Sequence, residues 1–522
     1  MRTFATLAVP GTYTSGGGPL VGRTVANAQF LKALVRHSGF EELALITGEN
    51  GDIEPLDALT KDWGAPEGRL AVYSLWQLPT LLQRGALDVL HHPSHVDRLH
   101  DLVALRDRYA SRTVPVTGQI HSLSYPRTHQ ELARMTFIEP SKSDGIFCSS
   151  SAGRLTMERG FEQVAPGKPH FELMQVPLGV DVDALQGGDR TGTRHELGLG
   201  DDEVLLLCLA RFTEYDKADL FPLLRVMERL VRGGTKVKLL LAGARQGTRT
   251  PEMLQLWARH LGLDGTVQLE LDFAEARKKH LLAAADVFVS PVDNIQETFG
   301  QSVVEAMAAG LPVVASDFDG YRDTVSDEVG IRIPARLGPD WSELSELAPL
   351  LYERPLHLVL GQSVELDLDA LEKALRELAQ DRARREALGK AAKQRAQTLY
   401  AWPKVIAQYE AHWERLAATG AKPSGKRHPL RLDFEQSFGH FFTGRVDGAR
   451  ALKPNPLAKD WIVYPELKNL FDDEDVRAAM LFAANGCTFD ALEAHLAARL
   501  KDRSAWVPRL IATWLVKQGL LQ

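Results

Sequence analysis

Residues 287–316 read VFVSPVDNIQETFGQSVVEAMAAGLPVVAS, and this stretch indicates the fold class most clearly. The apolar run Val287–Ser290 is typical of a strand that is buried on both faces. Apolar residues then recur at helical spacing over Gln301–Ala309, and Gly310 ends that helix. A second apolar run, Pro312–Ser316, follows at once. A strand, a helix and a strand in this order predict two parallel strands joined by a covering helix.

The same alternation continues outward from this stretch. Helical patterns recur at Thr24–His37 and at Leu220–Arg232, each between short apolar runs. Further strands are predicted at Thr3–Val9, Leu43–Thr47, Ala71–Ser74, Val89–His91, Val114–Gln119, Gly145–Cys148, Val204–Ala210, Val237–Ala242 and Val267–Leu271. Gly and Asp accumulate near Leu178–Thr191, between the two series of strands. The sequence therefore predicts an α/β protein with two units in series, each a mostly parallel sheet covered on both faces.

The rest of the chain is predicted to be helical. One charged helix is expected over Glu372–Tyr400 and another over Val405–Leu416, before a linker at Thr419–Pro429. Three short helices follow: Asp472–Asn485 with Asp472 as its cap, Thr488–Leu500 with Thr488 as its cap, and Ser504–Lys517. They resemble a helix-turn-helix or winged-helix bundle. The third helix has few cations, so we expect an interaction, dimerisation or acceptor-recognition unit and not a nucleic-acid-binding one. The phenylalanines of Leu430–Leu457 are expected to pack across the preceding domains or to guide an acceptor.

Bulk properties exclude several classes of protein. The chain has 522 residues, too many for one hydrophobic core, and a net charge of −7, which gives no general attraction to nucleic acid or anionic lipid. Its three cysteines are far apart and favour neither a disulfide framework nor a zinc site. We see no signal peptide and no apolar run long enough to span a membrane, so we expect a cytoplasmic protein.

The segment of residues 297–305 carries the strongest functional signal in the sequence. Ligands bind at the carboxyl ends of the strands in a parallel sheet, and Glu297 and Glu305 lie after one such strand, near a helix start. Gly300 allows the backbone to approach a ligand closely. The amides of Phe299 and Gly300, at a helix N-terminus, suit a diphosphate. One carboxylate can accept hydrogen bonds from the hydroxyls of a sugar, and the other can accept them from the hydroxyls of a ribose.

Four further positions also follow strands. Arg211 comes directly after a predicted strand, and Lys217 is six residues further on. Both cations are suited to neutralising a diphosphate. The plain alternative is that they form surface ion pairs with Glu214 or Asp216. The glycine-rich loop at residues 15–23 is either a flexible turn or a place where the backbone approaches the phosphates of a donor substrate or approaches an acceptor substrate. His121 follows another strand, where a histidine is more often structural. We decline a metal interpretation both for the histidines at residues 91–100 and for the sequence Asp-Val-Asp at 181–183.

Over residues 1–418 the chain resembles glycosyltransferase family 4, whose GT-B architecture has two facing Rossmann-like domains with a cleft between them. The motifs that carry the resemblance are the glycine-rich loop, His121, Pro177–Asp181, Arg211 and Lys217, Glu297–Glu305 with its AMAAGLPVVAS tail, and Tyr400–Trp402. The resemblance implies an acceptor-side domain over residues 1–185 and a nucleotide-sugar-binding domain over 186–400. A helix over 401–418 would cross back to the first domain. A linker at 419–429 and a small helical unit at 430–522 extend beyond the family pattern.

The resemblance also implies a retaining sugar transfer without a bound metal or other cofactor. Arg211 and Lys217 would then hold the diphosphate, and Glu297 with the amides of Phe299 and Gly300 would hold sugar and phosphate. Glu305 would hold the ribose, and His121 would face the reacting sugar. Gly17 or Gly18 would lie near the donor. The spacing between the arginine and the lysine is one residue longer than is usual in the family, and Leu337–Leu360 is longer and more hydrophobic than a typical connection.

The expected partners are a nucleoside diphosphate sugar and a saccharide, lipid-linked or protein acceptor. A saccharide or glycoconjugate acceptor comes first, and a protein or peptide recognised through the C-terminal unit comes second. A catalytically silent scaffold that only binds the nucleotide sugar is the alternative of another class. The C-terminal unit also offers a surface for a homo-oligomer or a protein partner.

Overall fold

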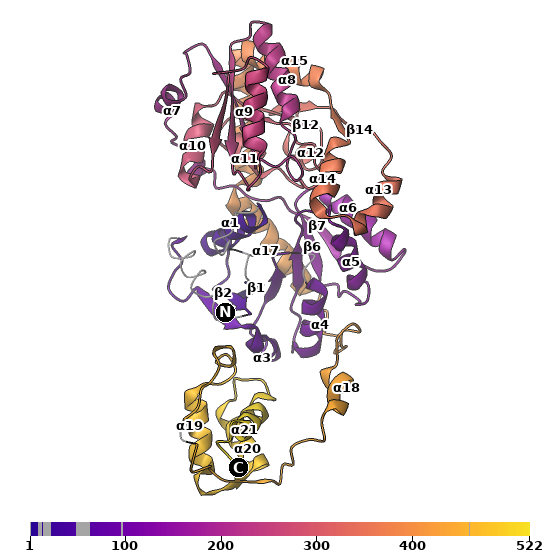
Figure 1. Cartoon of the computed structure of the whole chain (residues 1–522), viewed down its shortest axis with the longest axis vertical. Helices are drawn as coiled ribbons and strands as arrows, with labels where there is room; N and C mark the ends of the chain where they lie inside the picture. Colours follow the sequence, from indigo (N-terminus) through magenta and orange to yellow (C-terminus); the bar gives the residue numbers. More distant parts are fainter. Residues whose placement is uncertain (1, 9–12, 14–21, 49–62, 95–97, 459) are drawn as a thin grey trace.

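The computed structural model describes residues 2–8, 13, 22–48, 63–94, 98–458 and 460–522. Gly17 and Gly18 lie outside these residues. Two α/β domains follow one another along the longest axis, and a small helical unit lies beyond the first domain (Figure 1). None of the helices described there has both the length and the apolar character needed to cross a membrane.

The first domain is built on a seven-stranded sheet in the order β3-β2-β1-β4-β5-β6-β7. Every neighbouring pair is parallel, as the sequence predicts. The strands are β1 (Thr3–Leu7), β2 (Glu42–Thr47), β3 (Leu70–Ser74), β4 (Val89–His92), β5 (Val116–Gln119), β6 (Gly145–Cys148) and β7 (Glu172–Gln175). The helices are α1 (Gly22–His37), η3 (Leu75–Gln77), α3 (Leu78–Gln83), α4 (Leu99–Tyr109), α5 (Pro126–Met135) and α6 (Ser151–Val164).

The second domain repeats the scheme with six parallel strands in the order β10-β9-β8-β11-β12-β13. Its strands are β8 (Val204–Leu209), β9 (Val237–Gly243), β10 (Val267–Leu271), β11 (Val287–Ser290), β12 (Val313–Ser316) and β13 (Gly330–Ile333). Its helices are η4 (Asp183–Leu185), α7 (Arg190–Glu196), α8 (Phe221–Arg232), α9 (Thr250–His260), α10 (Glu275–Ala284), α11 (Gln301–Ala308) and α12 (Tyr321–Thr324). The apolar strands β8, β11 and β12 are buried along their whole length, which confirms the interpretation of residues 287–316.

A hairpin segment, residues 335–366, leaves the second domain after β13. Its base is the antiparallel pair β14 (Ala335–Leu337) and β15 (Val364–Leu366). Its tip contains α13 (Ser342–Leu347), η5 (Ala348–Leu350) and α14 (Glu353–Gln362). The sequence marks this stretch only as a long connection, because strands of three residues carry no visible alternation.

One predicted helix is in fact two. Residues 372–400 are divided between α15 (Leu368–Gln380), α16 (Arg382–Arg395) and a π-helical turn, η6 (Ala396–Tyr400). Asp381 separates the first two, because its backbone is extended and its carboxylate accepts the amide of Arg384 at 2.9 Å. An aspartate in this role ends one helix and caps the next.

Helix α17 (Trp402–Ala418) returns to the first domain, as the resemblance implies. It packs beside α1 on one face of the first sheet, whereas α3, α4, α5 and α6 cover the other face. The Tyr409 hydroxyl donates to Gln119 at 2.6 Å and the Trp413 indole donates to Thr117 at 3.0 Å. Gly179 is required where the chain turns, because a Cβ there would lie 2.3 Å from the Trp402 ring.

The C-terminal unit has a hydrophobic core of its own. Its elements are α18 (Phe434–Phe438), η7 (Gly439–Phe441), β16 (Ala451–Leu452), η8 (Pro465–Leu467), α19 (Asp473–Phe482), η9 (Ala483–Asn485), β17 (Cys487–Thr488), α20 (Phe489–Arg499) and α21 (Val507–Lys517). Asp472 and Thr488 cap their helices as predicted. Ser504 does not begin the third helix; it lies three residues before α21 and its hydroxyl donates to the carbonyl of Trp76.

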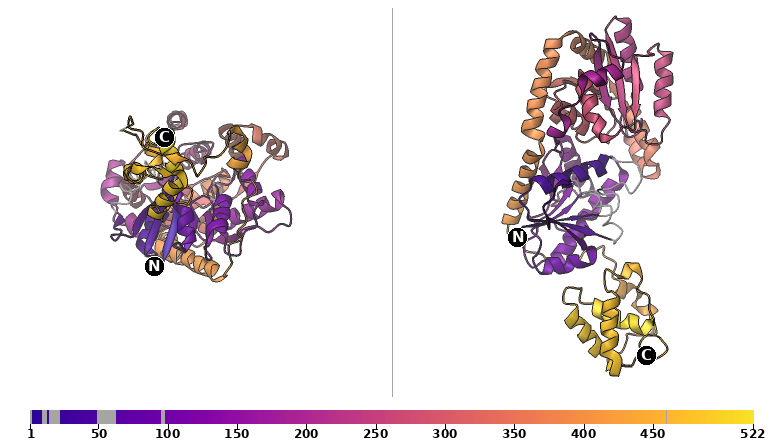
Figure 2. Two further views of the ribbon diagram at one scale, coloured as in Figure 1. Left: turned by 90° about the horizontal axis from the view of Figure 1, so that it is seen from below. Right: turned by 90° about the vertical axis from the view of Figure 1, so that its left-hand side faces the viewer.

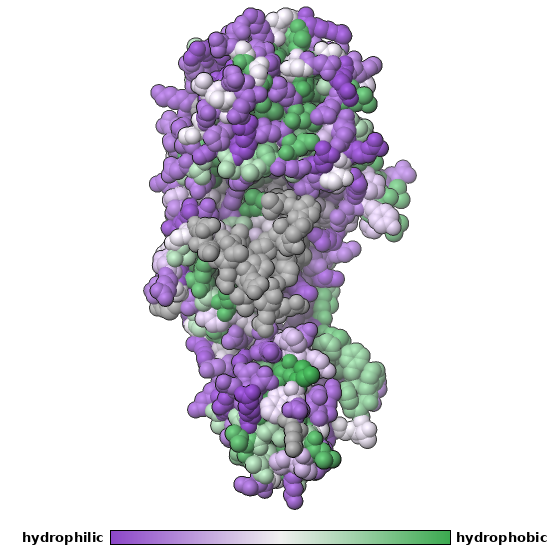
Figure 3. All heavy atoms as spheres, turned by 60° about the vertical axis from the view of Figure 1, so that its left-hand side comes forward, coloured by the Kyte–Doolittle hydropathy of each residue, from purple (hydrophilic) through white to green (hydrophobic). Residues whose placement is uncertain are grey.

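The unit lies on the side of the first domain that faces away from the second domain (Figures 1 and 2). It touches the first domain through the Arg84–Asp502 ion pair and through the rings of Trp76 and Trp506, 5.8 Å apart. The phenylalanines of α18 and the residues after it do not pack across the α/β domains. Phe434, Phe441 and Phe442 are exposed, and apolar surface gathers beside the unit in Figure 3.

Candidate functional site

A cavity of about 560 Å³ lies between the two α/β domains. The first domain contributes His121, Tyr125 and Arg127 among others, and the second contributes most of the charged side chains. The predicted site residues that line it are His121, Arg211, Lys217, Glu297, Phe299 and Glu305. Gly300 follows Phe299 directly, at the start of α11. The carboxyl ends of β8, β9 and β11 lead into this cavity, in keeping with where open parallel sheets bind ligands.

Glu297 is the most constrained side chain in the cavity. One carboxylate oxygen pairs with the ammonium of Lys217. The other accepts the backbone amides of Thr298, Phe299 and Gly300 at 3.1, 3.2 and 2.9 Å. Burial raises the pKa of Glu297, but the charge and hydrogen bond of Lys217 and the amide bonds outweigh it and lower the pKa to about 2. The carboxylate is therefore ionised at neutral pH, and both of its oxygens are already engaged.

The backbone at Gly300 explains how three successive amides converge on one oxygen. Gly300 has a φ of 93°, in the left-handed region, and caps α11. A Cβ at this position would lie 2.2 Å from the ring of Tyr321. Only glycine fits both the conformation and the space. The amides of Phe299 and Gly300, which the sequence suggests for a diphosphate, both donate to Glu297.

Arg211 lies two residues after the end of β8 and reaches the cavity. Its guanidinium pairs with Asp216 at 3.0 Å, and the Thr213 hydroxyl also donates to that carboxylate. The pairing with Asp216 is the plain alternative considered for this residue. The ion pair with Asp216 leaves the Arg211 side chain at the wall of the cavity. Arg211 can therefore pair with Asp216 and also bind a phosphate group.

Glu305 lies one turn inside α11 and is buried. Lys278 of α10 donates to it at 3.2 Å and also pairs with the exposed Glu275 at 2.7 Å. Burial raises the pKa of Glu305, and the charge of Lys278 partly offsets this. Lys278 is a cavity residue that the sequence interpretation missed. Its signal was the helical spacing to Leu281 and Leu282, which face the core three and four residues later.

His121 follows β5 by two positions, and its ring is oriented by the first domain. Its Nε2 lies 2.7 Å from the carbonyl oxygen of Pro93. Because a carbonyl only accepts, Nε2 carries the proton, and in the neutral ring Nδ1 is the basic nitrogen.

Hydrogen bonds across the cleft connect the two domains beside the cavity. The Tyr125 hydroxyl donates to the side-chain oxygen of Gln296 at 2.9 Å, and the Ser122 hydroxyl donates to the carbonyl of Gln296 at 3.2 Å. Both acceptors belong to the residue before Glu297. The first domain therefore helps to position the loop that carries the carboxylate.

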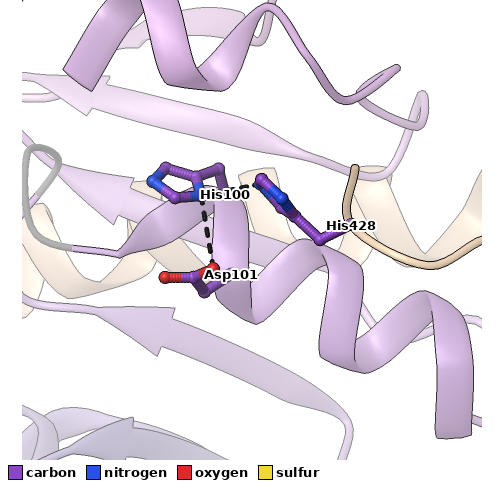
Figure 4. Close-up of side chains that lie close together, drawn as sticks. All are labelled: His100, Asp101 and His428. Carbon is purple, nitrogen blue, oxygen red and sulfur yellow. Dashed lines mark hydrogen bonds and ion pairs between the residues drawn. The ribbon is translucent and has the colours of Figure 1, made fainter. Parts of the chain in front are cut away.

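Within the described residues, one cluster has the composition of a metal site: His100, Asp101 and His428 (Figure 4). The Leu430 amide donates to Nδ1 of His428 at 3.0 Å, so the neutral ring carries its proton on Nε2. That nitrogen lies 2.9 Å from Nδ1 of His100, whose Nε2 in turn lies 3.3 Å from Glu131. A metal would need the Nε2 lone pair and leave the ring with no proton. The cluster instead fits a hydrogen-bond relay that fastens the linker to the first domain.

Comparisons with known proteins agree with this geometry. Residues 189–355 match the family model described as "Glycosyl transferases group 1". A D-inositol 3-phosphate glycosyltransferase of Geodermatophilus obscurus is 35% identical over 175 residues, which cover 32% of this chain and 38% of that protein. A phosphatidyl-myo-inositol mannosyltransferase of Mycobacterium tuberculosis is 31% identical over 252 residues, or 48% and 56% of the two chains. The chain thus spans between a third and three fifths of the length of these two relatives.

Solved structures share the fold at low sequence identity. Sucrose-phosphate synthase of Thermosynechococcus elongatus aligns with a TM-score of 0.55 and 19% identity, over 80% of this chain and all of that one. HepE of Anabaena, in complex with UDP, aligns with a TM-score of 0.54 and 15% identity, again over 80% and 100%. The chain therefore has the GT-B fold, and its second domain carries the segment that matches the group 1 glycosyl transferases.

Proposed function

We propose that the chain is a retaining, metal-independent glycosyltransferase. It would transfer a sugar from a nucleoside diphosphate donor to a hydroxyl of a saccharide or glycoconjugate. The observation that carries the proposal is the partly buried Lys217–Glu297 pair at a helix start, in a cavity that both domains line. The match of residues 189–355 to the group 1 model supports it.

The charges of the cavity are arranged for a diphosphate beside a sugar. Arg211 and Lys217 neutralise the charge that develops on the leaving diphosphate. The Ser302 hydroxyl, at the start of α11, lines the cavity and has no partner among the described protein atoms, so it suits a phosphate oxygen. Glu305 accepts hydrogen bonds from the hydroxyls of the ribose, and Lys278 holds the Glu305 carboxylate in place.

The transfer itself needs no nucleophile from the protein. The bond between the anomeric carbon and the diphosphate oxygen breaks, and the acceptor oxygen bonds to that carbon on the same face. The acceptor proton passes to the leaving phosphate oxygen. Glu297 supports this route because both of its oxygens are engaged and its pKa is about 2, which makes it a weak nucleophile. Its role is to fix Lys217, and the oxygen that pairs with Lys217 has capacity to accept a further hydrogen bond from a sugar hydroxyl.

The class of acceptor is suggested by the relatives and not by the charges of the cavity. Both named relatives above act, by their names, on inositol-containing acceptors, so inositol phosphates join simple saccharides as acceptors to test. A peptide acceptor held by the C-terminal unit is less favoured, because that unit lies on the side of the first domain away from the second domain (Figures 1 and 2), whereas the cavity lies between the two. We place the protein in the cytoplasm, which its three free cysteines support.

A thermal-shift screen against nucleotide sugars, with and without EDTA, tests the proposal. A donor at 100 times its dissociation constant stabilises the native state by about 2.7 kcal/mol. We expect one donor to raise the melting temperature, with EDTA making no difference, and Glu305→Gln to reduce the shift. If EDTA abolishes the shift, the transfer depends on a metal. If no donor in a complete panel produces one, the transferase proposal fails.

A further inference from the structure

A second cavity, of about 680 Å³, adjoins the first. The two share Tyr125 and Thr298, so the second begins beside the loop that carries Glu297. Its volume lies within the range of pockets that hold small ligands. The proposed donor site does not use this space.

Three parts of the chain form its walls. The first domain contributes residues of α5 and α6, including His129 and Ala152. The loops after β11 and β12 contribute Ile295 and Phe318. The hairpin segment closes the remaining side through α13, η5 and α14.

The hairpin segment is fixed across the cleft. Its His357 is buried, with Nε2 3.4 Å from the carbonyl oxygen of Ser124 in the first domain. The His357 ring also meets the Tyr125 ring edge-on, with centroids 5.0 Å apart. Asn294, in the loop after β11, donates to the carbonyl of His357 at 3.3 Å. The segment is therefore held from both domains, and the wall it makes is part of the folded structure.

The two cavities differ in chemistry. The first is lined by several charged side chains, which suit a diphosphate. The second is walled mainly by apolar side chains, among them Leu123, Phe318, Trp341, Leu344, Leu356 and Leu360. Such walls favour an occupant with an apolar body, because burying apolar surface is what stabilises it there.

A few polar groups at the walls give the occupant an orientation. The Ser124 hydroxyl and the Trp341 indole N–H are buried and have no hydrogen-bond partner among the described residues. Asp319 lies at the end near Glu297. Burial, and then the negative charge of Glu297, raise the pKa of Asp319 to about 8, so at neutral pH its carboxyl group is mostly protonated and able to donate.

We propose that this second cavity is the acceptor site, and that it takes an acceptor in which an aryl or alkyl body is attached to the hydroxyl-bearing part. The apolar body lies against the hairpin segment, and the hydroxyl-bearing part lies at the junction marked by Tyr125 and Thr298. This inference rests on the proposed function, and it names the class of acceptor.

Titration calorimetry on the full chain tests it, with the protein saturated by the nucleoside diphosphate that the donor screen selects. The probes are methyl, phenyl and octyl β-D-glucosides, which share one sugar and differ in the apolar body. We expect the phenyl and octyl compounds to bind about tenfold more tightly than the methyl compound, or better. Equal affinity for all three, or no binding by any, would overturn the inference.

Two matched variants locate the effect. Ser345 of α13 lines the second cavity and its neighbour Glu346 does not, although both residues are exposed. Ser345→Trp should fill the cavity and bring the phenyl and octyl affinities to that of the methyl compound, whereas Glu346→Trp should leave the preference intact. If Ser345→Trp keeps the preference, the second cavity is not the site. Donor affinity should be the same in both variants, so failure of the donor screen and failure here are separate results.

Discussion

The ammonium of Lys217 and the carboxylate of Glu297 form an ion pair inside the cavity between the two domains, with each side chain less than one-fifth exposed. The lysine follows β8 and the glutamate follows β11, which are neighbours in the sheet. The pair therefore places a cation and an anion at adjacent strand ends, where a diphosphate and a sugar would meet.

Removing the cation should destabilise the protein in a way that depends on pH. Lys217→Met leaves the largely enclosed Glu297 carboxylate without its counter-charge; breaking a fully buried pair typically costs about 3–5 kcal/mol, and we expect a loss toward the lower end of that range for this partly buried pair. Because the pKa of Glu297 is lowered to about 2, its contribution is present above the unfolded pKa of about 4.5 and disappears as the pH falls toward 2. Urea unfolding should show a large loss at pH 7 that shrinks as the pH falls below 4.5.

Lys236→Met is the matched control for that experiment. Lys236 also pairs with a carboxylate, that of Asp202, but both side chains are about two-thirds exposed. Exposed pairs contribute little, so this variant should change stability far less than Lys217→Met does. Equal losses in the two variants would mean that the Lys217–Glu297 pair has no special role.

The carboxylate of Glu305 should affect nucleotide binding more than that of Glu275, although both pair with Lys278. Glu305 lines the cavity and is buried, whereas Glu275 is largely exposed. Glu305→Gln should raise the dissociation constant of the donor's nucleotide about tenfold, the loss of a charge-assisted hydrogen bond. Glu275→Gln should raise it less than twofold. Calorimetric titration of both variants measures this, and equal effects would place Glu305 outside the nucleotide site.

Asp319 should make the protein less stable as the pH rises. Its pKa is raised from 3.8 to about 8, so the folded state binds more protons than the unfolded state between these values. Stability from this group therefore falls as the pH rises from about 4 to 8. Asp319→Asn removes the titration and suits the left-handed backbone there, with a φ of 44°. The variant should melt at a higher temperature than the parent, and this difference should be larger at pH 8 than at pH 5. The same difference at both pH values would contradict the raised pKa of Asp319.

The C-terminal unit should be separable from the donor site. It has its own core and contacts the first domain through few side chains, such as Arg84 and Trp76. A chain that ends at Pro429 retains the linker contact of His428 and should keep its donor affinity within twofold. Scanning calorimetry should show one transition fewer than the full chain. A donor affinity lowered tenfold or more would show that the unit supports the site.

The sequence predicted the central part of the molecule well, for a physical reason. Strands such as β8 and β11 are buried on both faces, so they must be continuously apolar, and the residues after them must face the cavity. The Glu297 loop was visible because glycine and two carboxylates interrupt an apolar stretch. Helix caps at Asp472 and Thr488 were visible because a capping side chain acts on its own neighbours.

What the sequence did not predict depends on distant contacts. Asp381 ends one helix and caps another, yet in the sequence it is one more charged residue of a helical stretch. Lys278 is one of three adjacent cations; its helical spacing to Leu281 and Leu282 turns it inward, but its partner Glu305 lies on another helix. The hairpin segment has no periodicity, and its place is set by contacts such as that of His357 with Ser124, 233 residues apart in the chain. The second cavity is formed by these long-range contacts, which no local sequence pattern predicts.

The most direct test of the central claim is calorimetric titration of the nucleotide sugar selected by the screen into the parent protein and into Lys217→Met, at pH 7 in EDTA. We expect one site per chain in the parent, and a dissociation constant at least tenfold higher in the variant, because the variant lacks the cation that would neutralise the diphosphate. An unchanged affinity in Lys217→Met, with the variant shown to be folded by circular dichroism, would contradict the claim that the Lys217–Glu297 pair marks the donor site.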